Sequence, residues 1–187
     1  MSANTPVRVF VGLPIPADVR DHLKKLRLKA REATKTIPGK WVPPENWHIT
    51  LTFIGSLDPA QIDRLIELLE EKYSGYQPFD ALLSGVRWFP GEFKPKMIVA
   101  EVQLNAQLLA IKLRSDQAVK AMDIPPDKRS YRPHITLARF NQRLSPTPLP
   151  EPASQLPGIR VDQITLYQSV PVESGVKYVD LHHITLG

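Results

Sequence analysis

The sequence predicts an α+β fold, and three observations support this prediction. Segments rich in β-branched and aromatic residues alternate with segments whose apolar residues recur every three or four positions, which are the patterns of strands and of amphipathic helices. A strand, a helix and a proline-rich loop also precede the tetrapeptide HITL twice, at 48–51 and at 134–137. The 187 residues are enough for one well-filled core and few for two. We therefore expect one domain, 1–187, with an internal repeat of approximately 7–55 and 96–140.

The first quarter of the chain is expected to form a strand, a helix and a second strand. Residues 7–15 have the β-branched and aromatic content of a buried strand. Residues 17–33 carry apolar side chains at helical spacing with basic residues between them, which predicts an amphipathic helix. A loop rich in proline follows, and 47–55 is then a strand that Gly55 is expected to end.

The middle of the chain is expected to form a helix and a hairpin. Asp58 before Pro59 is typical of an N-cap followed by the first helical position, so a helix is predicted from there to about 73–75. Two strands, 79–89 and 95–104, are separated by FPGEFKP, a proline- and glycine-containing connection of the hairpin type.

The last part of the chain begins with a third helix, which Asn105 is expected to cap. A loop leads from it into the strand HITLARF. The proline-rich stretch 144–158 is expected to be extended and poorly structured. Two closing strands, near 160–169 and 176–186, flank a turn at 173–175.

Composition excludes several classes of protein. The chain contains no cysteine, which rules out disulfides, thiolate zinc sites and cysteine nucleophiles. No apolar run approaches the roughly 20 residues needed to cross a bilayer, and the start lacks the basic region of a signal peptide. We expect a soluble, cytoplasmic protein that does not associate with a membrane, and nothing in the sequence indicates an obligate protein partner.

Positive charge is concentrated between residues 20 and 40. Eight lysines and arginines stand there against two acids, a net +6 within a chain whose formal charge is +5. One interpretation is a solvated helix face, and the other is an electrostatic footprint for phosphate chains. Charge alone does not decide between them.

The two repeated HITL segments predict a pair of active histidines. Alternate side chains of a strand share a face, so His48 lies beside Thr50, and His134 beside Thr136. If the repeats are related by an approximate two-fold axis, the two pairs face each other. One imidazole can then act as base and the other as acid on opposite sides of a phosphorus atom, while the threonine hydroxyls donate hydrogen bonds to the phosphate oxygens. The scheme requires neither a metal nor another cofactor.

A third HITL copy, at 183–186, lacks the strand, helix and loop that precede the other two. The tripeptide ITL also occurs at 164–166 without a histidine, and it is good strand-forming sequence in any context. We therefore predict that His183 occupies an ordinary position in a sheet. A zinc site on three histidines stays open as an alternative, although the sequence has no HExxH motif, and so does a purely structural role for His48 and His134.

The stretches RVFVGLPIP, WVPPENWHITLTFIG and RSYRPHITLARF, in this order and spacing, resemble the 2H phosphoesterase superfamily, most closely its RNA 2′,3′-cyclic phosphodiesterases, also called 2′-5′ RNA ligases. The resemblance covers most of residues 7–140. It implies a bilobal fold of two pseudo-symmetric halves, with mainly antiparallel sheets and flanking helices around a central cleft. It also implies metal-independent hydrolysis of RNA 2′,3′-cyclic phosphate ends to 2′-phosphate, and the reverse reaction with a 5′-hydroxyl RNA end, which is 2′-5′ ligation.

The resemblance further implies roles for individual residues. His48 is the proton donor to the departing 3′ oxygen, and His134 is the base that activates water, although the sequence itself assigns only a pair. Arg139 matches a position where the family often holds the nucleotide with arginine. Its odd offset from His134 points it to the far face unless the strand twists or bulges after Thr136.

Two further residues are candidates for substrate binding. Arg132 has the right parity but is separated from the strand by Pro133, and Phe10 is equally suited to stacking a base and to the core. Competing functions are action on another cyclic or 2′-5′ linked nucleotide, and RNA-end binding without turnover.

Overall fold

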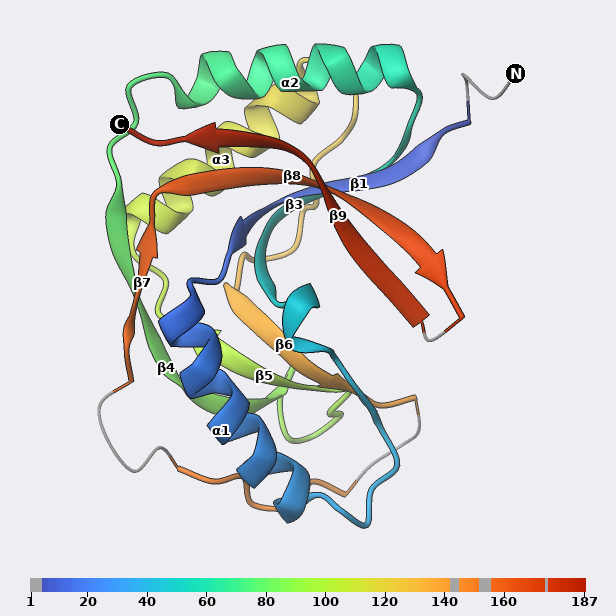
Figure 1. Ribbon diagram of the computed structural model, residues 1–187, viewed down its shortest axis with the longest axis vertical. Helices are drawn as coiled ribbons and strands as arrows, with labels where there is room; N and C mark the ends of the chain where they lie inside the picture. Colours follow the sequence, from blue (N-terminus) through green and yellow to red (C-terminus); the bar gives the residue numbers. More distant parts are fainter. Residues whose placement is uncertain (1–4, 142–144, 152–155, 174) are drawn as a thin grey trace.

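The computed structural model describes residues 5–141, 145–151, 156–173 and 175–187. Figure 1 shows a strongly curled sheet with three helices packed around it. The elements in chain order are β1 (Val7–Pro14), α1 (Ala17–Ala33), β2 (Lys40–Trp41), the short helix η1 (Pro44–Asn46), β3 (His48–Leu57), α2 (Pro59–Tyr73), β4 (Phe79–Phe89), β5 (Met97–Val102), α3 (Ala106–Lys120), β6 (His134–Arg139), β7 (Gly158–Val161), β8 (Gln163–Val172) and β9 (Gly175–Thr185). The predicted α+β class is confirmed.

The sheet consists of two halves with related strand orders. Its nine strands follow the order β7-β4-β5-β6-β3-β1-β8-β9, with β2 paired to β6, and the pairings are antiparallel. Strands β3, β1, β8 and β9 form what we name the β1 half, and β6, β5, β4, β7 and β2 form the β5 half. The two meet where β3 pairs with β6 at Ile49 and Ile135. On one side of this contact the order is β3 and then β1, and on the other side it is β6 and then β5. Strand β3 therefore corresponds to β6, and β1 corresponds to β5.

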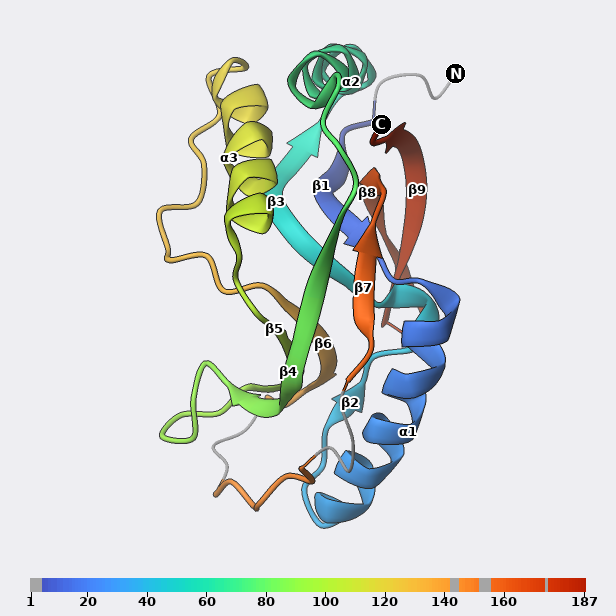
Figure 2. The ribbon, with the colours of Figure 1, turned by 90° about the vertical axis from the view of Figure 1, so that its left-hand side faces the viewer.

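The helices are exchanged between the halves. Figures 1 and 2 show α2 and α3 beside the β1 half, and α1, which directly follows β1, beside the β5 half. Helix α3, which follows β5, contacts β3 and α2. At the other end of the molecule, the guanidinium of Arg27 on α1 lies 5.8 Å from the ring of Trp41 on β2. Each repeat therefore contributes its helix to the opposite half.

Apolar periodicity explains where the helices form. Helix α1 buries the residues at helical spacing that predicted it, and its bounds match the predicted 17–33. Helix α2 starts with a capping box in which Asp58 accepts from the amide of Gln61 while the Gln61 side chain accepts from the amide of Asp58. Asn105 caps α3 by accepting from the Leu108 amide at 2.8 Å. In the described part of the chain, no helix is both long and apolar enough to span a membrane.

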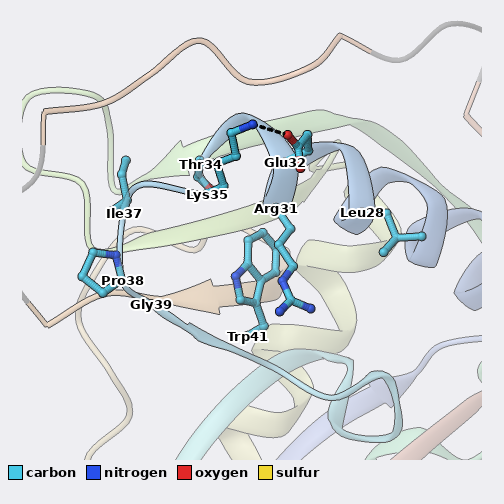
Figure 3. A pocket seen from close by; sticks show the side chains of 9 residues that line it. All are labelled: Leu28, Arg31, Glu32, Thr34, Lys35, Ile37, Pro38, Gly39 and Trp41. Carbon is cyan, nitrogen blue, oxygen red and sulfur yellow. Dashed lines mark hydrogen bonds and ion pairs between the residues drawn. The ribbon is translucent and has the colours of Figure 1, made fainter.

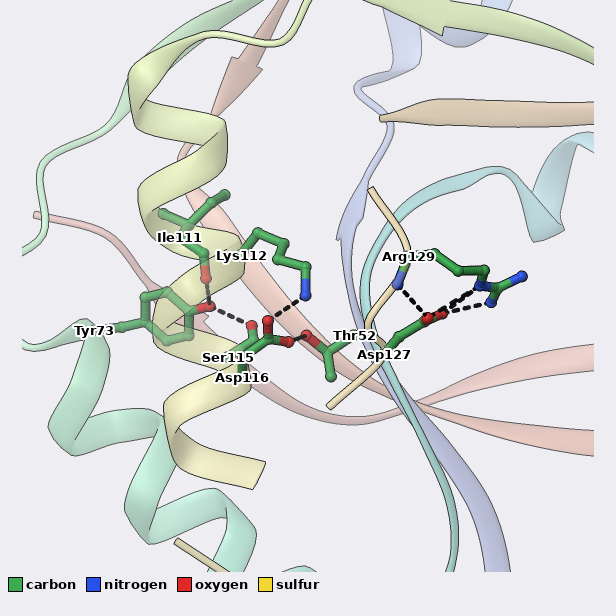
Figure 4. Close-up of polar contacts among 8 residues, drawn as sticks. All are labelled: Thr52, Tyr73, Ile111, Lys112, Ser115, Asp116, Asp127 and Arg129. Carbon is green, nitrogen blue, oxygen red and sulfur yellow. Dashed lines mark hydrogen bonds and ion pairs between the residues drawn. The ribbon is translucent and has the colours of Figure 1, made fainter. Parts of the chain in front are cut away.

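A buried polar cluster joins α2, α3 and β3 (Figure 4). The Tyr73 hydroxyl donates to the carbonyl of Ile111 at 2.6 Å and contacts the hydroxyl of Ser115. Lys112 forms an ion pair with Asp116, whose second oxygen accepts from Thr52 Oγ1 at 2.8 Å. Lys112 is only 7% exposed, so its charge is stabilised by the carboxylate of Asp116 rather than by solvent. The cluster anchors α3 behind the part of β3 that follows the first HITL segment.

Two strand boundaries differ from prediction because pairing overrides local signals. Strand β3 does not end at Gly55; it continues to Leu57 because Val7 of β1 pairs with Leu57, and Gly55 adopts φ 106° beside an irregularity in that pairing. The predicted strand 160–169 is two strands, since β7 pairs with β4 and β8 pairs with β1.

Two predicted loops are also more ordered than expected. The proline-rich loop before β3 contains β2, which pairs with β6 through Lys40 and Arg139. Of the predicted extended stretch 144–158, residue 144 and residues 152–155 lie outside the described residues, as does Ser174 of the predicted turn. Of the described residues, 145–151 have no helix or strand, and Gly158 begins β7. The carbonyl of Thr147 nevertheless accepts from Trp88 Nε1 at 2.8 Å.

Candidate active site

Strands β3 and β6 present the two HITL segments in the same way. Starting at each histidine, both strands alternate between partly exposed and buried residues, and both then place two consecutive buried residues before an exposed one. Ile49 and Ile135 are fully buried and pair with each other. Alternation therefore turns His48, Thr50, His134 and Thr136 to the opposite side of the sheet. We name this side the histidine face, and it brings the four predicted catalytic side chains together.

The ring of His48 is fixed at both nitrogens. Its Nδ1 lies 2.8 Å from the carbonyl oxygen of Asn46, which only accepts, so Nδ1 carries a hydrogen. In the neutral ring Nε2 is then the acceptor, and Thr50 Oγ1 donates to it at 3.0 Å. The arrangement defines the tautomer and holds Nε2 beside the hydroxyl that the sequence assigned to the same site.

His134 is held by the equivalent contact in the β5 half. Its Nδ1 donates to the carbonyl of Arg132 at 2.7 Å, again two residues earlier in the chain. Phe89 stacks on its ring with a centroid distance of 4.5 Å. The guanidinium of Arg132 lies 4.5 Å from the ring of Phe89 and donates to the carbonyl of Pro90 at 2.7 Å. These contacts of Arg132 hold Phe89 against His134, while its predicted role in substrate binding stays a prediction.

Aromatic side chains also support His48. The ring of Phe10 lies 4.7 Å from that of His48 and 5.0 Å from that of Tyr167, on which it stacks. Tyr178 meets both Phe10 and His48 edge-on, at 5.0 and 4.9 Å. Phe10 is 3% exposed, so the surrounding rings leave little surface for a nucleobase. Of the two interpretations of Phe10, the structure therefore favours packing, with His48 as one of its partners.

The site lowers the pKa of both histidines. Burial is the main cause at His48 and lowers its pKa to about 4, with the positive charges of Arg139 and His134 adding to the effect. Burial also lowers the pKa of His134, and the charges of Arg139 and Arg132 act in the same direction. In the free protein at neutral pH both rings are therefore neutral, and an anion bound between them would favour their protonated forms.

Arg139 belongs to the histidine face because β6 bulges. Val99 of β5 pairs with Thr136, whereas the neighbouring Ile98 pairs with Ala138, so Leu137 is an extra residue in β6. This bulge follows Thr136 and reverses the parity of the positions after it. The side chain of Arg139 is exposed and its charge acts on both histidines. The alternative that placed it on the far face does not apply.

Sequence reasoning also missed Gly12 and Asn46, which shape the site around His48. Gly12 pairs with Thr50, and a Cβ at Gly12 would lie 2.9 Å from the carbonyl oxygen of Ile49 and 3.5 Å from Cδ2 of His48. Glycine therefore allows the close approach of β1 to the histidine. Asn46 donates to the carbonyl of Val176 at 2.6 Å and accepts from the amide of Tyr178 at 3.1 Å. It joins the segment before His48 to β9, a partner that is remote in sequence.

Residues 183–185 of the third HITL copy end strand β9, as predicted. His183 pairs with Thr165 of β8, and its Nδ1 lies 2.6 Å from Gln163 Nε2. Its Nε2 is 3.6 Å from a carboxylate oxygen of Asp180. The prediction that His183 is a sheet position is confirmed. In the described residues, no three or more histidine, cysteine or carboxylate side chains form a group suited to hold a metal ion.

A pocket of about 510 Å³ lies away from the histidines, between the last turn of α1 and β2 (Figure 3). Figure 3 shows the indole of Trp41 within it, beside the guanidinium of Arg31, with Lys35 paired to Glu32 at the rim. Lys40, the neighbour of Trp41 along β2, pairs with Arg139. The pocket therefore belongs to the basic segment 20–40 and lies one strand away from the arginine of the histidine face.

Comparisons with known proteins agree with this architecture. The model of the LigT-like phosphoesterase family matches residues 13–99 and 98–178, and each match contains one of the first two HITL segments. The RNA 2′,3′-cyclic phosphodiesterase of Bacillus subtilis is 34% identical over 134 residues, covering 70% of this chain and 69% of the relative. That of Methanothermobacter thermautotrophicus is 25% identical and covers 94% and 96%. The crystal structure of TT0787 from Thermus thermophilus superposes with a TM-score of 0.80 at 28% identity, covering 96% of this chain and 97% of the other.

Proposed function

The chain belongs to the LigT-like phosphoesterase family, and from this premise we propose that it hydrolyses RNA 2′,3′-cyclic phosphate ends to 2′-phosphate. The relatives named RNA 2′,3′-cyclic phosphodiesterase support this reaction. The observation that carries it is the pairing of Ile49 with Ile135, which places both histidines and both threonines on one face. Diagonal neighbours across an antiparallel pair lie roughly 7–8 Å apart at Cα, a separation that leaves room for one phosphate between the rings of His48 and His134.

The reaction requires a base on one side of phosphorus and an acid on the other. Neutral His134 takes a proton from water through Nε2 while the water oxygen bonds to phosphorus. The bond from phosphorus to the 3′ oxygen breaks, and protonated His48 supplies the proton that this oxygen needs. The products are a 3′-hydroxyl and a 2′-phosphate. Because each Nδ1 is held by a carbonyl, each Nε2 is the nitrogen that faces the phosphate.

The role of His48 as donor depends on the substrate. Its pKa of about 4 leaves it neutral in the free protein at pH 7. The negative charge of the bound phosphate favours the imidazolium and raises that pKa. Once Nε2 of His48 is protonated, it can no longer accept the hydrogen bond from Thr50. The Thr50 hydroxyl can then donate to a phosphate oxygen. Thr136 and Arg139 provide hydrogen bonding and positive charge to the same group.

The same face supports the same displacement with another nucleophile. A 5′-hydroxyl RNA end in the place of water gives its proton to His134 while its oxygen bonds to phosphorus. The bond from phosphorus to the 3′ oxygen breaks as His48 protonates that oxygen, and the products are a 2′-5′ linkage and a 3′-hydroxyl. The catalytic scheme uses no metal ion, and RNA is the partner that it requires. We assign these events to the cytoplasm on the basis of the sequence alone.

The test is the conversion of a pentameric RNA that ends in a 2′,3′-cyclic phosphate, with a chelator present. We expect 2′-phosphate as the product, identified by ³¹P NMR, and no stimulation by added divalent cations. A variant with both His48→Ala and His134→Ala is the background control. A 3′-phosphate product, or activity that appears only with metal, would refute the mechanism.

A further inference from the structure

Glu101 places a carboxylate on the histidine face. It lies on β5 as the Cα partner of His134 on β6, and the side chains of direct partners in an antiparallel pair share a face. In the β1 half the corresponding partners are Pro14 on β1 and His48 on β3. The two halves therefore differ beside their histidines: one has a negative charge there, and the other has an uncharged ring.

A carboxylate at this position works against the binding of an anion, because it repels the phosphate that the face is proposed to hold. Its partner in the structure is Arg132, whose Nη2 lies 3.6 Å from Glu101 Oε1. The side chains are partly exposed, at 36% for Glu101 and 46% for Arg132, so solvent weakens their attraction. The pair therefore contributes little to overall stability, and what it can change is the geometry and the charge around its neighbours.

Arg132 connects this pair to the ring of His134 in two ways. Its carbonyl accepts the hydrogen of His134 Nδ1 at 2.7 Å, and its guanidinium lies 4.5 Å from the ring of Phe89, which stacks on His134. The guanidinium also donates to the carbonyl of Pro90 at 2.7 Å. Glu101 and Pro90 together hold the guanidinium against Phe89, and the ring of Phe89 defines the plane of the His134 ring.

The pair also balances charge beside the proposed base. Burial is the main cause that lowers the pKa of His134; the charges of Arg139 and Arg132 add to the lowering, and the charge of Glu101 opposes it. On the side of β3, the titratable group that acts together with His134 is His48, which is neutral in the free protein at pH 7. Glu101 therefore offsets the charge of the guanidinium that supports the ring, which favours the imidazolium formed when His134 takes a proton from water.

We infer that Glu101 is a positioning residue for His134: it holds Arg132 against Phe89 and offsets the charge of the guanidinium. This inference rests on the proposed function, in which His134 is the base, and it involves no contact between Glu101 and the substrate. Glu101→Gln keeps the size of the side chain and removes its charge, so the guanidinium loses its acidic partner. Phe89 is then held less firmly, and Nε2 of His134 spends less time facing the attacking water.

The experiment is a double-mutant cycle of Glu101→Gln and Arg132→Ala, with a pentameric RNA that ends in a 2′,3′-cyclic phosphate as substrate. Misplacement of a catalytic group costs up to about 100-fold and an exposed ion pair is weak, so Glu101→Gln should lower kcat by about 3- to 10-fold. Its KM should stay the same or fall, since a negative charge near the bound phosphate is removed. The double variant should equal Arg132→Ala in kcat within about twofold, and Glu101→Asp should recover part of the loss.

The pH profile of kcat/KM is a second readout. Its alkaline limb reports the loss of the last proton held by the pair of histidines. Glu101→Gln removes a charge that favours protonated His134 and should move this limb to lower pH, whereas Arg132→Ala removes an opposing charge and should move it to higher pH. NMR titration of the His134 ring should show the same two shifts in the absence of RNA.

Asp80→Asn is the matched control, since Asp80 is another carboxylate of the β5 half that pairs with an arginine, Arg160, at 3.2 Å. It should change neither kcat nor the pH profile. For Glu101→Gln, an unchanged kcat, a loss that adds fully to that of Arg132→Ala, or a rise of KM alone would each overturn the positioning role while the reaction stands. Failure of the wild-type protein to open the RNA end would instead refute the proposed function, and the NMR shifts would still test the coupling of Glu101 to His134.

Discussion

Ile49 and Ile135 are Cα partners at the junction of the two halves, and each directly follows a histidine of the candidate site. Both are fully buried. Because alternate side chains of a strand share a face, burial of this pair turns His48, Thr50, His134 and Thr136 to the other side of the sheet. One pair of core residues therefore determines how two motifs that are 86 positions apart in the sequence combine into one site.

Removal of either active histidine should abolish most of the reaction. Because a positioned acid or base contributes typically about 10²- to 10⁴-fold, His48→Ala and His134→Ala should each lower kcat by that order. The double variant should lose little more than the worse single one, since the two groups act as a unit. His183→Ala, at a sheet position on β9, should retain most activity. A comparable loss in all three single variants would contradict a site of two motifs.

The pH dependence should differ between the free protein and the substrate complex. Catalysis needs one ring charged and one neutral, a state found between the two pKa values of the pair. Both pKa values are lowered, that of His48 to about 4, so kcat/KM should be bell-shaped, peak below pH 6.5 and fall as pH rises toward 8. Bound phosphate raises the pKa of the charged ring, so the kcat maximum should lie at higher pH. Coincident maxima, or a flat kcat/KM between pH 5 and 8, would argue against the scheme.

Gly12→Ala should disturb the site from the opposite strand. The new Cβ would lie 2.9 Å from the Ile49 carbonyl oxygen, so β1 and β3 must move apart next to His48. We expect a loss of kcat of about 10-fold or more and a lower free energy of unfolding by about 1–3 kcal/mol. Gly91→Ala is the matched control, since a Cβ there has no neighbour within 4 Å. Unchanged kinetics for Gly12→Ala would mean that the spacing between β1 and β3 does not affect catalysis.

The buried ion pair behind β3 should be costly to break from one side. Asp116→Ala leaves Lys112 unpaired at 7% exposure and removes the acceptor of Thr52, so the free energy of unfolding should fall by about 3–5 kcal/mol. Replacing both partners, with Lys112→Met added, should recover part of the loss. The exposed pair of Arg64 with Glu67 provides a control, because Glu67→Ala should cost less than about 1 kcal/mol. Urea denaturation measures all three, and equal losses for Asp116→Ala and Glu67→Ala would disprove the burial argument.

The basic segment 20–40 should contribute to RNA binding if it contacts the phosphate chain. Arg31 lines the pocket beside Trp41, whereas Lys29 on the same helix does not line it. On that hypothesis Arg31→Ala weakens binding of an eight-nucleotide RNA several-fold, reduces the salt dependence by about 0.7 in the logarithmic slope and leaves a mononucleotide unaffected. Lys29→Ala is the charge-matched control. Equal effects of the two variants in fluorescence titrations would favour the alternative of a solvated helix face.

Local signals were sufficient to predict most elements of the fold. The apolar spacing of α1, the capping residues Asp58 and Asn105, and the duplicated approach to HITL depend on neighbours within a few residues, and the structure confirms them. The short strands β2 and β7 could not be predicted this way, since each consists of a few residues whose strand character comes from pairing with distant partners, β6 and β4.

In the candidate site, too, local sequence patterns predict some residues, whereas others depend on pairing between distant strands. Four of its side chains follow from strand alternation, but the bulge that turns Arg139 to the histidine face depends on pairing with β5. The supports of the histidine rings, Tyr167, Tyr178 and Phe89, come from strands remote in sequence, and no local pattern marks them.

The exchange of helices between the halves has a consequence for dissection of the molecule. Helix α1 of the first repeat lies beside the strands of the β5 half (Figures 1 and 2), and α3 of the second repeat packs against β3. The last two strands, β8 and β9, complete the β1 half. Neither repeat is an autonomous folding module, so a gene cut at the 74–78 connection should yield two polypeptides that are each insoluble or unfolded alone. Co-expressed, they should reassemble as a split enzyme, with turnover as the reporter of their association.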